Sequence, residues 1–259
     1  MFLKNPSIMH YFGKSDIGKK YDHNEDFFAL PVSNPQIKIT KQDIKTKGYL
    51  FVLCDGVGGL NAGEVASQMA ATWILKDYYS NNTSSENPGE NLRKAILNTN
   101  YRLYNLAQEH ESYHGMGTTV VAALFFEGKV FVFSAGDSRL YNLQRDRLIQ
   151  ITEDQSEVWQ LYKSGQLSKD ELRFHPRNNI ITVAMGIEKD INLQSYVYNY
   201  QKNDLFLLCS DGLSDMVGDE DIKNILQKKR NIKKKVNLLI DEANKNGGKD
   251  NITAVLVEI

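Results

Sequence analysis

Two apolar runs separated by only two turn residues constrain the fold of this chain more than any other feature. Residues 119–126 read TVVAALFF, residues 129–135 read KVFVFSA, and Glu127 and Gly128 stand between them. Runs of this length joined by so short a linker predict a β-hairpin of two buried strands. Further short strands are expected at 138–143, 147–152, 197–200, 204–209 and 251–259. Hairpin-spaced strands favour antiparallel sheets over a repeated β-α-β winding.

Helical periodicity occupies much of the remaining chain. Val65, Met69 and Trp73 recur every four residues, so one broad face of a helix is apolar. Further helices are predicted over 91–109, 158–166, 169–174, 219–227 and 232–244. Residues 49–54, YLFVLC, form a short apolar run typical of a strand buried on both faces, and the polar stretches 34–47 and 80–91 are expected to be surface excursions. This order of elements predicts an α+β fold in which a two-layer sheet core is covered by helices.

Composition narrows the classes of function. The 259 residues carry 31 basic and 32 acidic side chains, a net charge of −1, which argues against a strongly basic nucleic-acid-binding protein. No stretch approaches the roughly 18 consecutive apolar residues of a membrane-spanning helix, and MFLKNPSIMH lacks the plan of a secretory signal. Two cysteines, Cys54 and Cys209, cannot form a disulfide framework, which fits a reducing cytoplasm. Without a Pro-, Gly- or Ser-rich linker, a single domain over residues 1–259 is expected.

Acidic residues stand beside apolar runs or turns at five places along the chain. Asp55 and Asp211 end apolar runs and are each followed by glycine, and Asp250 precedes the last run. The other two places are the Glu25-Asp26 pair and Asp137. Any one of them alone is better explained as a helix cap or a turn residue. Converging together, these carboxylates would repel one another without a cation, and ligands that are all oxygen favour Mg²⁺ or Mn²⁺ over Zn²⁺.

The residues around these acids match one known family in the same order along the chain. The chain resembles the metal-dependent protein phosphatases of the PP2C type, the PPM family, and in particular their compact bacterial members. The match runs from about Ser15 to Val257 through SDIGKKYDHNED, VLCDGVGGLNAGEVAS, GMGTTVVAAL, SAGDSRLYNL, ITEDQS, LYKSGQLSKDEL, HPRNNIIT, MGIE, NDLFLLCSDGLSDMV and GGKDNITAVLV. The resemblance implies a four-layer α-β-β-α sandwich, with two central antiparallel sheets flanked by helices and a flap, at about 156–181, over the metal cleft.

The resemblance also implies the metal ligands and the reaction. The metal-binding residues carried over are Glu25, Asp26, Asp55, Gly56, Asp137, Asp211 and Asp250. Asp55 would bridge two ions, Asp211 and Asp250 would complete the shell of the first, and these three aspartates would be the catalytic ones. The Gly56 carbonyl joins one of the two ions, Glu25 and Asp26 act through water at the second, and Asp137 helps to hold a third. The implied reaction is hydrolysis of phosphoserine or phosphothreonine by a hydroxide that bridges the two Mn²⁺ or Mg²⁺ ions.

Three positions depart from the family pattern. Tyr21 stands where the family usually has an arginine that holds the substrate phosphate, and tyrosine brings neither the charge nor the two-pronged fork. Lys19, Lys20 or His23 would then supply the cation, or activity is weak, or the chain is a non-catalytic module that binds phosphoproteins. Gln155 replaces a usual histidine and is interpreted as a packing variation. Val57 replaces a histidine of many eukaryotic members, which leaves a metal-bound water or His23 as the proton donor.

The resemblance further suggests partners. Phosphorylated proteins are expected substrates, in particular the targets of a Hanks-type serine/threonine kinase in the cytoplasm. No nucleic-acid or membrane partner is expected, and the protein is expected to be a monomer. The basic run 228–235, KKRNIKKK, is interpreted as a solvated helix-loop face because it has few aromatic neighbours.

Overall fold

Two antiparallel sheets lie face to face in the computed structural model, which describes residues 9–31, 37–58, 62–80 and 87–259. The first sheet has the order β1-β11-β10-β7-β8, and the second has the order β2-β3-β5-β6-β9 with the short β4 paired to β3. The strands are β1 (His10–Asp16), β2 (Asp26–Ala29), β3 (Tyr49–Val57), β4 (Gly117–Thr118), β5 (Val120–Phe126), β6 (Lys129–Ala135), β7 (Arg139–Gln144), β8 (Arg147–Gln150), β9 (Gln194–Asn199), β10 (Leu205–Cys209) and β11 (Ile252–Glu258).

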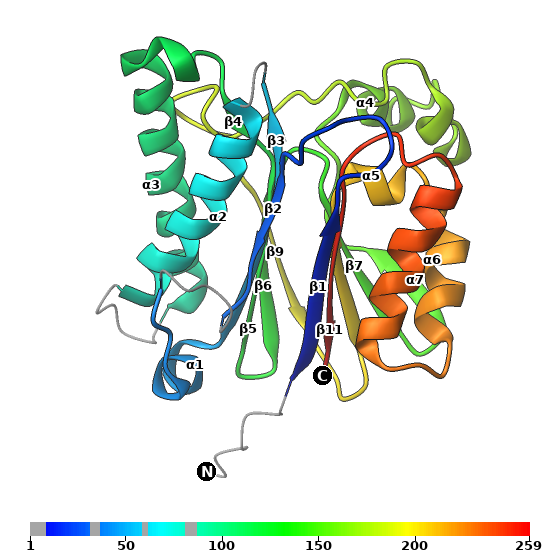
Figure 1. Cartoon of the computed structure of the whole chain (residues 1–259). Helices are drawn as coiled ribbons and strands as arrows, with labels where there is room; N and C mark the ends of the chain where they lie inside the picture. The colour runs from blue at the N-terminus through cyan, green and yellow to red at the C-terminus, as the bar shows by residue number, and fades with distance from the viewer. Residues whose placement is uncertain (1–8, 32–36, 59–61, 81–86) are drawn as a thin grey trace.

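Helices cover the outer face of each sheet, which gives four layers in the order α-β-β-α (Figure 1). The helices are α1 (Lys41–Lys47), α2 (Ala62–Ser80), α3 (Pro88–Glu109), α4 (Glu157–Lys163), α5 (Asp211–Ser214), α6 (Asp219–Gln227) and α7 (Ile232–Lys245), with 3₁₀ turns η1 (Glu111–Tyr113) and η2 (Lys169–Phe174). Helices α2 and α3 lie outside the β3 sheet, and α6 and α7 lie outside the β11 sheet (Figure 1). The expected four-layer α+β sandwich is therefore confirmed.

Three apolar clusters fill the spaces between these layers, and the central one joins the two sheets. Phe51 on β3 and Phe125 on β5 meet edge to face, with ring centroids 5.7 Å apart. Phe125 also meets Phe206 of β10, on the opposite sheet, at 5.0 Å. Aromatic rings packed in this way contribute beyond their buried area. Together they hold the two sheets in a fixed relation to each other.

The two cysteines are apolar core residues in this architecture. Cys54 on β3 and Cys209 on β10 are both free thiols with no exposed surface. Burial raises the pKa of Cys209 to about 12 and that of Cys54 still further. Neither thiol is therefore ionised at neutral pH, and neither serves as a nucleophile.

Most elements appear where the sequence predicts them, and the elements that it does not predict lack a strong apolar pattern. Strands β1 and β2 were not predicted because one is only half-buried and the other has four residues. Helix α1 lies within the polar stretch 34–47 and buries no side chain; a capping box between Thr40 and Asp43 starts it. Helix α3 begins at Pro88, inside the other expected excursion. Residues 34–36 and 81–86 of these stretches lie outside the described residues.

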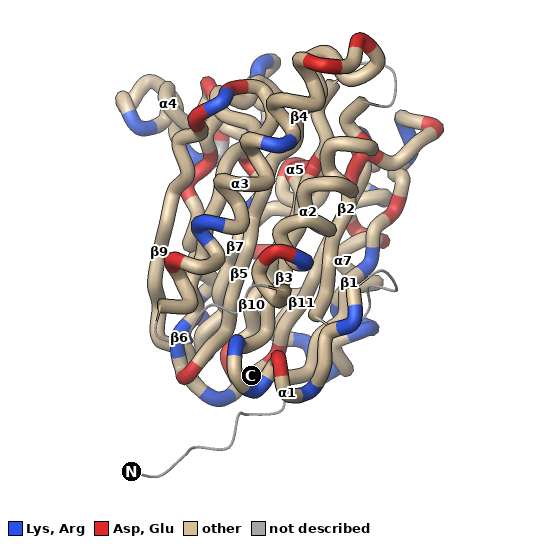
Figure 2. The backbone as a smooth tube through the Cα atoms, turned by 90° about the vertical axis from the view of Figure 1, so that its left-hand side faces the viewer, with Lys and Arg blue, Asp and Glu red and all other residues tan. Residues whose placement is uncertain are grey.

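The ends of the sandwich differ in what they carry. The C-terminus and α1 lie at one end, and α4 and α5 lie at the other (Figure 1). Figure 2 shows lysine and arginine residues along the end that carries α1 and the turn before β6.

Within the described ranges, no helix combines the length and the apolar character that crossing a membrane requires.

An excursion at residues 156–181, here called the flap segment, leaves the sandwich after β8 and returns before β9. An isolated β-bridge between Ser156 and Ile181 closes its neck. The Glu157 N–H donates to the Ile180 carbonyl at 2.9 Å, and the Thr182 N–H donates to the Gln155 carbonyl at 2.7 Å. These hydrogen bonds hold the two ends of the flap segment together where it meets the core. Helix α4 and the turn η2 within it lie close to the predicted short helices.

Candidate metal centre

The acidic residues singled out in the sequence come together at the end of the sandwich that carries α5. Asp55 lies near the end of β3, and Asp137 follows β6 of the same sheet. Asp211 begins α5 directly after β10, and Asp250 precedes β11, so these two belong to the opposite sheet. Both sheets thus contribute carboxylates to one place, because the strands concerned begin or end at the same edge of the sandwich.

A cleft of about 420 Å³ opens between these strand ends. Of the predicted site residues, those that line it are Tyr21, His23, Glu25, Asp55, Gly56, Asp137, Asp211 and Asp250. Two others, Lys20 and Asp26, do not line it. Residues Val57, Thr119, Asn179 and Ile181 complete much of its wall. The structure therefore brings eight of the ten predicted positions into a single cavity.

Asp26 lies behind the cleft wall, opposite Asp55 in the β2–β3 register. Its side chain is buried, and Oδ2 accepts a hydrogen bond from Ser210 Oγ at 2.7 Å. The other oxygen, Oδ1, is buried and has no hydrogen-bond partner among the described residues. Burial raises the pKa of this carboxyl to about 7, and the nearby Asp250 charge adds to the shift. A buried carboxylate oxygen without a donor is a strong acceptor that a cation or a cation-bound water would satisfy.

The other carboxylates raise one another's pKa values. Burial is the largest cause for Asp55 and Asp211, whose pKa values lie well above the ordinary range. The next cause is the charge of Asp26 for Asp55 and the charge of Asp137 for Asp211. Burial and the Asp154 charge raise the pKa of Asp137 to about 7. Anionic oxygens gathered in this way, without clustered nitrogen or sulfur ligands, suit a hard divalent ion such as Mg²⁺ or Mn²⁺.

These residues line the cleft without forming a ready-made cage. Across the described residues, no three His, Cys, Asp or Glu side chains lie close enough together to enclose an ion as they stand. Gly56 also lines the cleft, and its backbone carbonyl would be an additional oxygen ligand, as the family resemblance implies. The donor set therefore fits a divalent centre in which side-chain and backbone oxygens contribute jointly.

Glycine is required beside Asp55 and Asp211 because backbones approach closely there. A Cβ atom on Gly56 would lie 2.2 Å from the Gly63 carbonyl oxygen at the start of α2. A Cβ atom on Gly212 would lie 2.0 Å from the Asn251 carbonyl oxygen. No positive φ occurs at either glycine, so it is the close approach of neighbouring backbone that leaves no room for a side chain there.

Asn251 fixes the loop that carries Glu25, a role that the sequence did not reveal. Its Oδ1 accepts a hydrogen bond from the Glu25 N–H at 2.7 Å. Its Nδ2 donates to the carbonyls of Ile17 at 2.9 Å and His23 at 3.1 Å. The only signal was its position next to Asp250, since its three partners are more than 200 residues away in the chain.

Thr119 fixes Asp55 against the loop that carries Asp137. Its Oγ1 accepts a hydrogen bond from the Asp55 N–H at 3.0 Å and lies 2.7 Å from Ser138 Oγ. Both side chains are buried. The Ser138 hydroxyl is therefore engaged in this contact and has a structural role.

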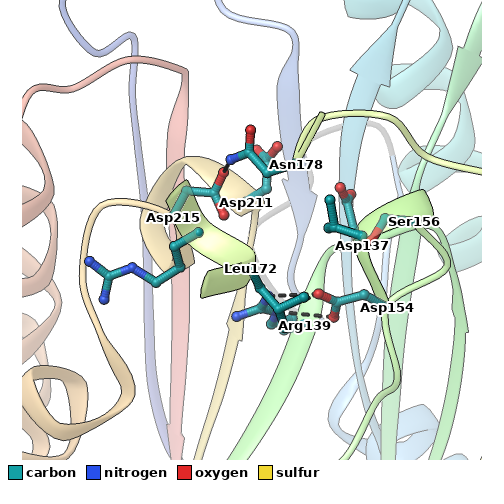
Figure 3. Close-up of a pocket in the computed structure, with 10 residues that line it drawn as sticks. Asp137, Arg139, Asp154, Ser156, Leu172, Asn178, Asp211 and Asp215 are labelled. Carbon is teal, nitrogen blue, oxygen red and sulfur yellow. Dashed lines mark hydrogen bonds and ion pairs between the residues drawn. The ribbon is translucent and has the colours of Figure 1, made fainter. Parts of the chain in front are cut away.

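A second buried network lies beneath Asp137. Arg139 donates to both oxygens of Asp154, from Nε at 3.0 and 3.1 Å and from Nη2 at 2.6 Å (Figure 3). Its Nη1 donates to the Tyr141 hydroxyl at 2.9 Å. Gln155 packs next to this pair and binds the Gly136 N–H through Oε1 and the Asn192 carbonyl through Nε2, both at 2.9 Å. These contacts give Gln155 the packing role that the sequence suggested.

Tyr21, Lys20 and His23 form a polar rim at the mouth of the cleft. Lys20 Nζ donates to the Tyr21 hydroxyl at 2.7 Å and lies 4.6 Å from the centre of the ring, and Tyr21 is 41% exposed. His23 Nδ1 lies 2.9 Å from Asp22 Oδ1, and Nε2 lies 3.2 Å from Glu25 Oε1. Hydrogen bonds to Asp22 and then Glu25 raise the pKa of His23. The rim thus carries positive charge beside an aromatic hydroxyl.

The chain is similar to known phosphatases over nearly its whole length. The protein phosphatase 2C family model matches residues 38–257. The chain is 37% identical to the serine/threonine phosphatase stp of Listeria innocua, with 96% of each chain covered. Its fold matches the crystal structure of the serine/threonine phosphatase Stp1 from Staphylococcus aureus, with a TM-score of 0.88, 36% identity and coverage of 100% of this chain and 98% of that one.

A further solved structure bears on the metal question. The catalytic domain of the serine/threonine protein phosphatase PstP, in complex with two manganese ions, matches with a TM-score of 0.81, 30% identity and coverage of 96% of this chain and 97% of that one. The sequence match, the shared sandwich and the acidic cleft all agree. The chain therefore belongs to the protein phosphatase 2C family and is a protein phosphatase.

Proposed function

We propose that this protein removes phosphate from phosphoserine and phosphothreonine residues of proteins, at a binuclear Mn²⁺ or Mg²⁺ centre in the cleft. The observation that supports this most directly is the set of carboxylates from both sheets that line one cavity. No lysine or arginine is among the described residues that line it. Excess negative charge in a half-buried site calls for bound cations, and bound cations attract a phosphate group.

The ligand roles are those that the family resemblance implies. Asp55 and the Gly56 carbonyl would hold the ions jointly with Asp211 and Asp250 at the first and with Glu25 and Asp26, through water, at the second. Asp137 with Asp211 would hold a third ion. When bound, the ions neutralise charge on the phosphoryl oxygens and activate water as the nucleophile.

The rim residues would handle the substrate. The Lys20 ammonium and the Tyr21 hydroxyl, joined at 2.7 Å, present donors to a phosphate oxygen at the mouth of the cleft. They replace a guanidinium with a cation and a neutral donor on separate side chains. His23 lines the cleft, and its hydrogen bonds to Asp22 and then Glu25 raise its pKa and so favour its protonated form. It is therefore placed to protonate the serine or threonine oxygen that leaves.

The relatives indicate the biological setting. The Listeria and Staphylococcus proteins are named serine/threonine phosphatases, so we assign phosphorylated proteins as substrates, in particular targets of a Hanks-type kinase in the cytoplasm. We propose that the protein acts as a monomer. A non-catalytic binding module is not favoured, because all seven predicted ligand positions keep their oxygen donors and the relatives are named as enzymes.

Hydrolysis of a phosphothreonine peptide tests the proposal. Phosphate release should require Mn²⁺ or Mg²⁺ and stop when the ions are chelated. Asp55→Asn and Asp211→Asn should each lower kcat/KM by roughly 100-fold or more, since each removes a charged ligand. Asp146→Asn, in an exposed turn between β7 and β8, is the matched control and should leave the rate unchanged. Undiminished turnover in chelator, or in either ligand variant, would contradict the proposal.

A further inference from the structure

A small second chamber lies behind the flap segment, next to the metal cleft. It holds about 10 Å³, enough for one water molecule. Asp137 and Asp211 line both this chamber and the cleft. Val158 and Leu172 of the flap segment cover the chamber, and each is only 5% exposed. The inner face of the flap segment therefore packs against the residues that support the metal site (Figure 3).

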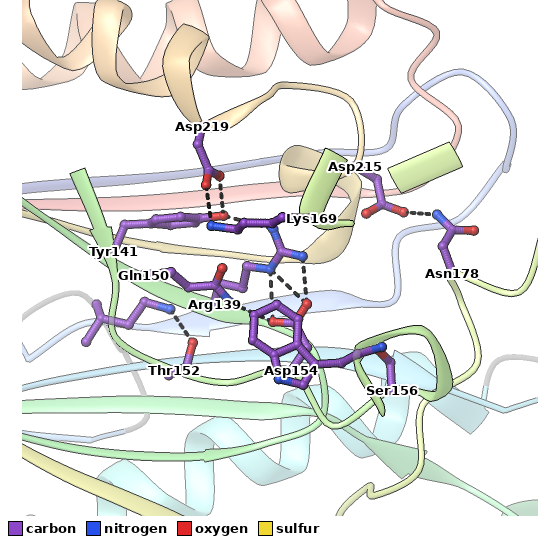
Figure 4. A network of polar contacts seen from close by, with 12 residues as sticks. Arg139, Tyr141, Gln150, Thr152, Asp154, Ser156, Lys169, Asn178, Asp215 and Asp219 are labelled. Carbon is purple, nitrogen blue, oxygen red and sulfur yellow. Dashed lines mark hydrogen bonds and ion pairs between the residues drawn. The ribbon is translucent and has the colours of Figure 1, made fainter. Parts of the chain in front are cut away.

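Two polar contacts join the flap segment to the chain that follows Asp211. Asn178 Nδ2 donates a short hydrogen bond to Asp215 Oδ2 (Figure 4). Lys169 Nζ donates to Asp219 Oδ2 at 2.8 Å, and Asp219 Oδ1 accepts a hydrogen bond from the Tyr141 hydroxyl at 3.1 Å. Asp211, Asp215 and Asp219 follow one another at intervals of four residues. One short stretch of chain thus carries a proposed metal ligand and both partners of the flap segment.

The Asn178 contact is the stronger of the two. The Lys169 and Asp219 side chains are 47% and 39% exposed, and ion pairs of such exposure contribute little. Asn178 and Asp215 are only partly exposed, and their bond has a charged acceptor. Charge-assisted hydrogen bonds shielded from water are about twice as strong as neutral ones. Burial of Val158 and Leu172 adds apolar contact beside it.

The residue after Asn178 faces the other cavity. Asn178 lines the inner chamber, whereas Asn179 and Ile181 line the metal cleft. Fixing the Asn178 side chain against Asp215 therefore fixes the backbone that presents Asn179 and Ile181. The Arg177–Glu157 ion pair joins this returning part of the flap segment to α4, and the Ser156–Ile181 bridge closes the neck.

We infer that Asn178 and Asp215 are positioning residues that hold the flap segment as one wall of the cleft. This wall, presented by Asn179 and Ile181, contacts the polypeptide on either side of the phosphorylated residue. The inference takes its substrate from the proposed function. It adds a pair of residues that makes the enzyme favour phosphorylated proteins over small phosphoesters. A small aryl phosphate has no polypeptide on either side of its phosphate group, so it should depend less on this wall.

Asn178→Asp is the variant that tests the contact. At pH 8 it places a carboxylate against Asp215, so the flap segment is repelled instead of held. The KM for a phosphothreonine peptide should rise about tenfold, the factor that losing one such hydrogen bond produces. The kcat and KM for p-nitrophenyl phosphate should stay within about twofold, because the metal ligands are untouched. An equal loss on both substrates would overturn the inference.

The reciprocal exchange separates positioning from any other role of Asp215. In the double variant Asn178→Asp with Asp215→Asn, the donor and acceptor change places and the hydrogen bond is restored. Peptide KM should return to within about twofold of the parent value. Asp215→Asn alone keeps an acceptor for Asn178 but removes its charge, so it should raise peptide KM less than Asn178→Asp does. If the double variant is no better than Asn178→Asp, the contact does not position the flap segment.

Limited trypsin digestion tests the same contact without an activity assay. Lys163, Lys169, Arg173 and Arg177 all lie in the flap segment. Asn178→Asp should accelerate cleavage there about tenfold, and the double variant should reverse the effect. A cleavage rate that Asn178→Asp leaves unchanged would overturn the inference. Should the parent protein hydrolyse neither substrate, the proposed function fails, while the cleavage rates still decide whether the contact holds.

Discussion

At the scale of single residues, the mouth of the cleft differs from the family pattern in how positive charge is supplied. A guanidinium would offer a permanent charge and two parallel donors. Tyr21 offers one hydroxyl, and that hydroxyl already accepts a hydrogen bond from Lys20. Tyr21 is 41% exposed, so substrate has access to the pair. We therefore expect phosphate binding at the rim to be weaker than with an arginine, and the metal ions to provide most of the attraction.

Replacing Tyr21 by arginine should strengthen phosphate binding. Tyr21→Arg should lower the KM for a phosphothreonine peptide several-fold, with roughly 1–2 kcal/mol gained from a charge-assisted bidentate contact. Steady-state kinetics with Mn²⁺ held constant measures the change. Tyr21→Phe is the matched control, since it removes the hydroxyl that Lys20 contacts and should raise KM instead. A KM that does not respond to either substitution would exclude Tyr21 from the phosphate site.

The acidic residues were predictable from sequence because position along a strand identifies them. Asp55 and Asp211 each terminate an apolar run, and ends of neighbouring strands meet at one edge of a sheet. Asp26 could be named but not placed, since its depth depends on the β2–β3 register. The Asn178–Asp215 contact could not be predicted at all. It depends on how the flap segment packs on a stretch 37 residues away, for which no sequence periodicity exists.

At the scale of elements, strand β3 is held at both ends by side chains from other elements. Thr119 binds the Asp55 N–H at one end. At the other end, the Tyr79 hydroxyl of α2 donates to the Gly48 carbonyl at 2.8 Å and accepts from the Leu50 N–H at 3.1 Å. The hydroxyl is buried, so both backbone groups depend on it. The apolar periodicity of this segment predicts helix α2, but it does not predict that the Tyr79 hydroxyl binds the backbone at the start of β3.

Tyr79→Phe should destabilise the fold without changing the chemistry. The phenyl ring keeps the packing, but two buried backbone groups lose their partner, at a cost of about 1–3 kcal/mol. Urea unfolding followed by tryptophan fluorescence measures the loss. Tyr101→Phe, on an exposed side chain of α3, should cost nothing measurable. Equal stabilities for the two variants would show that the Tyr79 hydroxyl makes no net contribution.

At the scale of the whole molecule, the candidate metal centre joins the two halves of the sandwich. Asp55 and Asp137 belong to the β3 sheet, and Asp211 and Asp250 to the β11 sheet. Without cations their mutual repulsion pushes apart the ends that Phe125 and Phe206 hold together deeper in the core. Bound divalent ions would attract the carboxylates of both sheets and so replace that repulsion by attraction. Stability should therefore depend jointly on metal and on pH.

Metal should stabilise the protein more at pH 7.5 than at pH 5. The folded-state pKa values of Asp26 and Asp137 are raised to about 7 from an ordinary 3.8, so the folded chain binds more protons than the unfolded one between these values. Metal-free stability from these groups is thus full below about pH 4 and is lost as pH rises through 7. Mg²⁺ binds the ionised form, so saturating Mg²⁺ should raise Tm by roughly 5–10 °C at pH 7.5 and much less at pH 5.

Thermal unfolding at both pH values checks this directly. KCl at matched ionic strength is the control and should produce only a small shift at either pH. Asp211→Asn should reduce the Mg²⁺ effect at pH 7.5. A Tm gain that is the same at pH 5 and pH 7.5 would contradict the assignment of these carboxylates to the metal site.

The place of β11 in the first sheet has a consequence for synthesis. This strand, residues 252–258, is paired with β1 on one side and β10 on the other, and Asp250 directly precedes it. A sheet that lacks it is split into two pieces, with β1 separated from the rest. While the ribosome still holds residues 250–258, the nascent chain has neither a closed sheet nor its full set of carboxylates. We therefore expect phosphatase activity to appear only after residues 250–258 have left the ribosome and β11 has paired with β1 and β10.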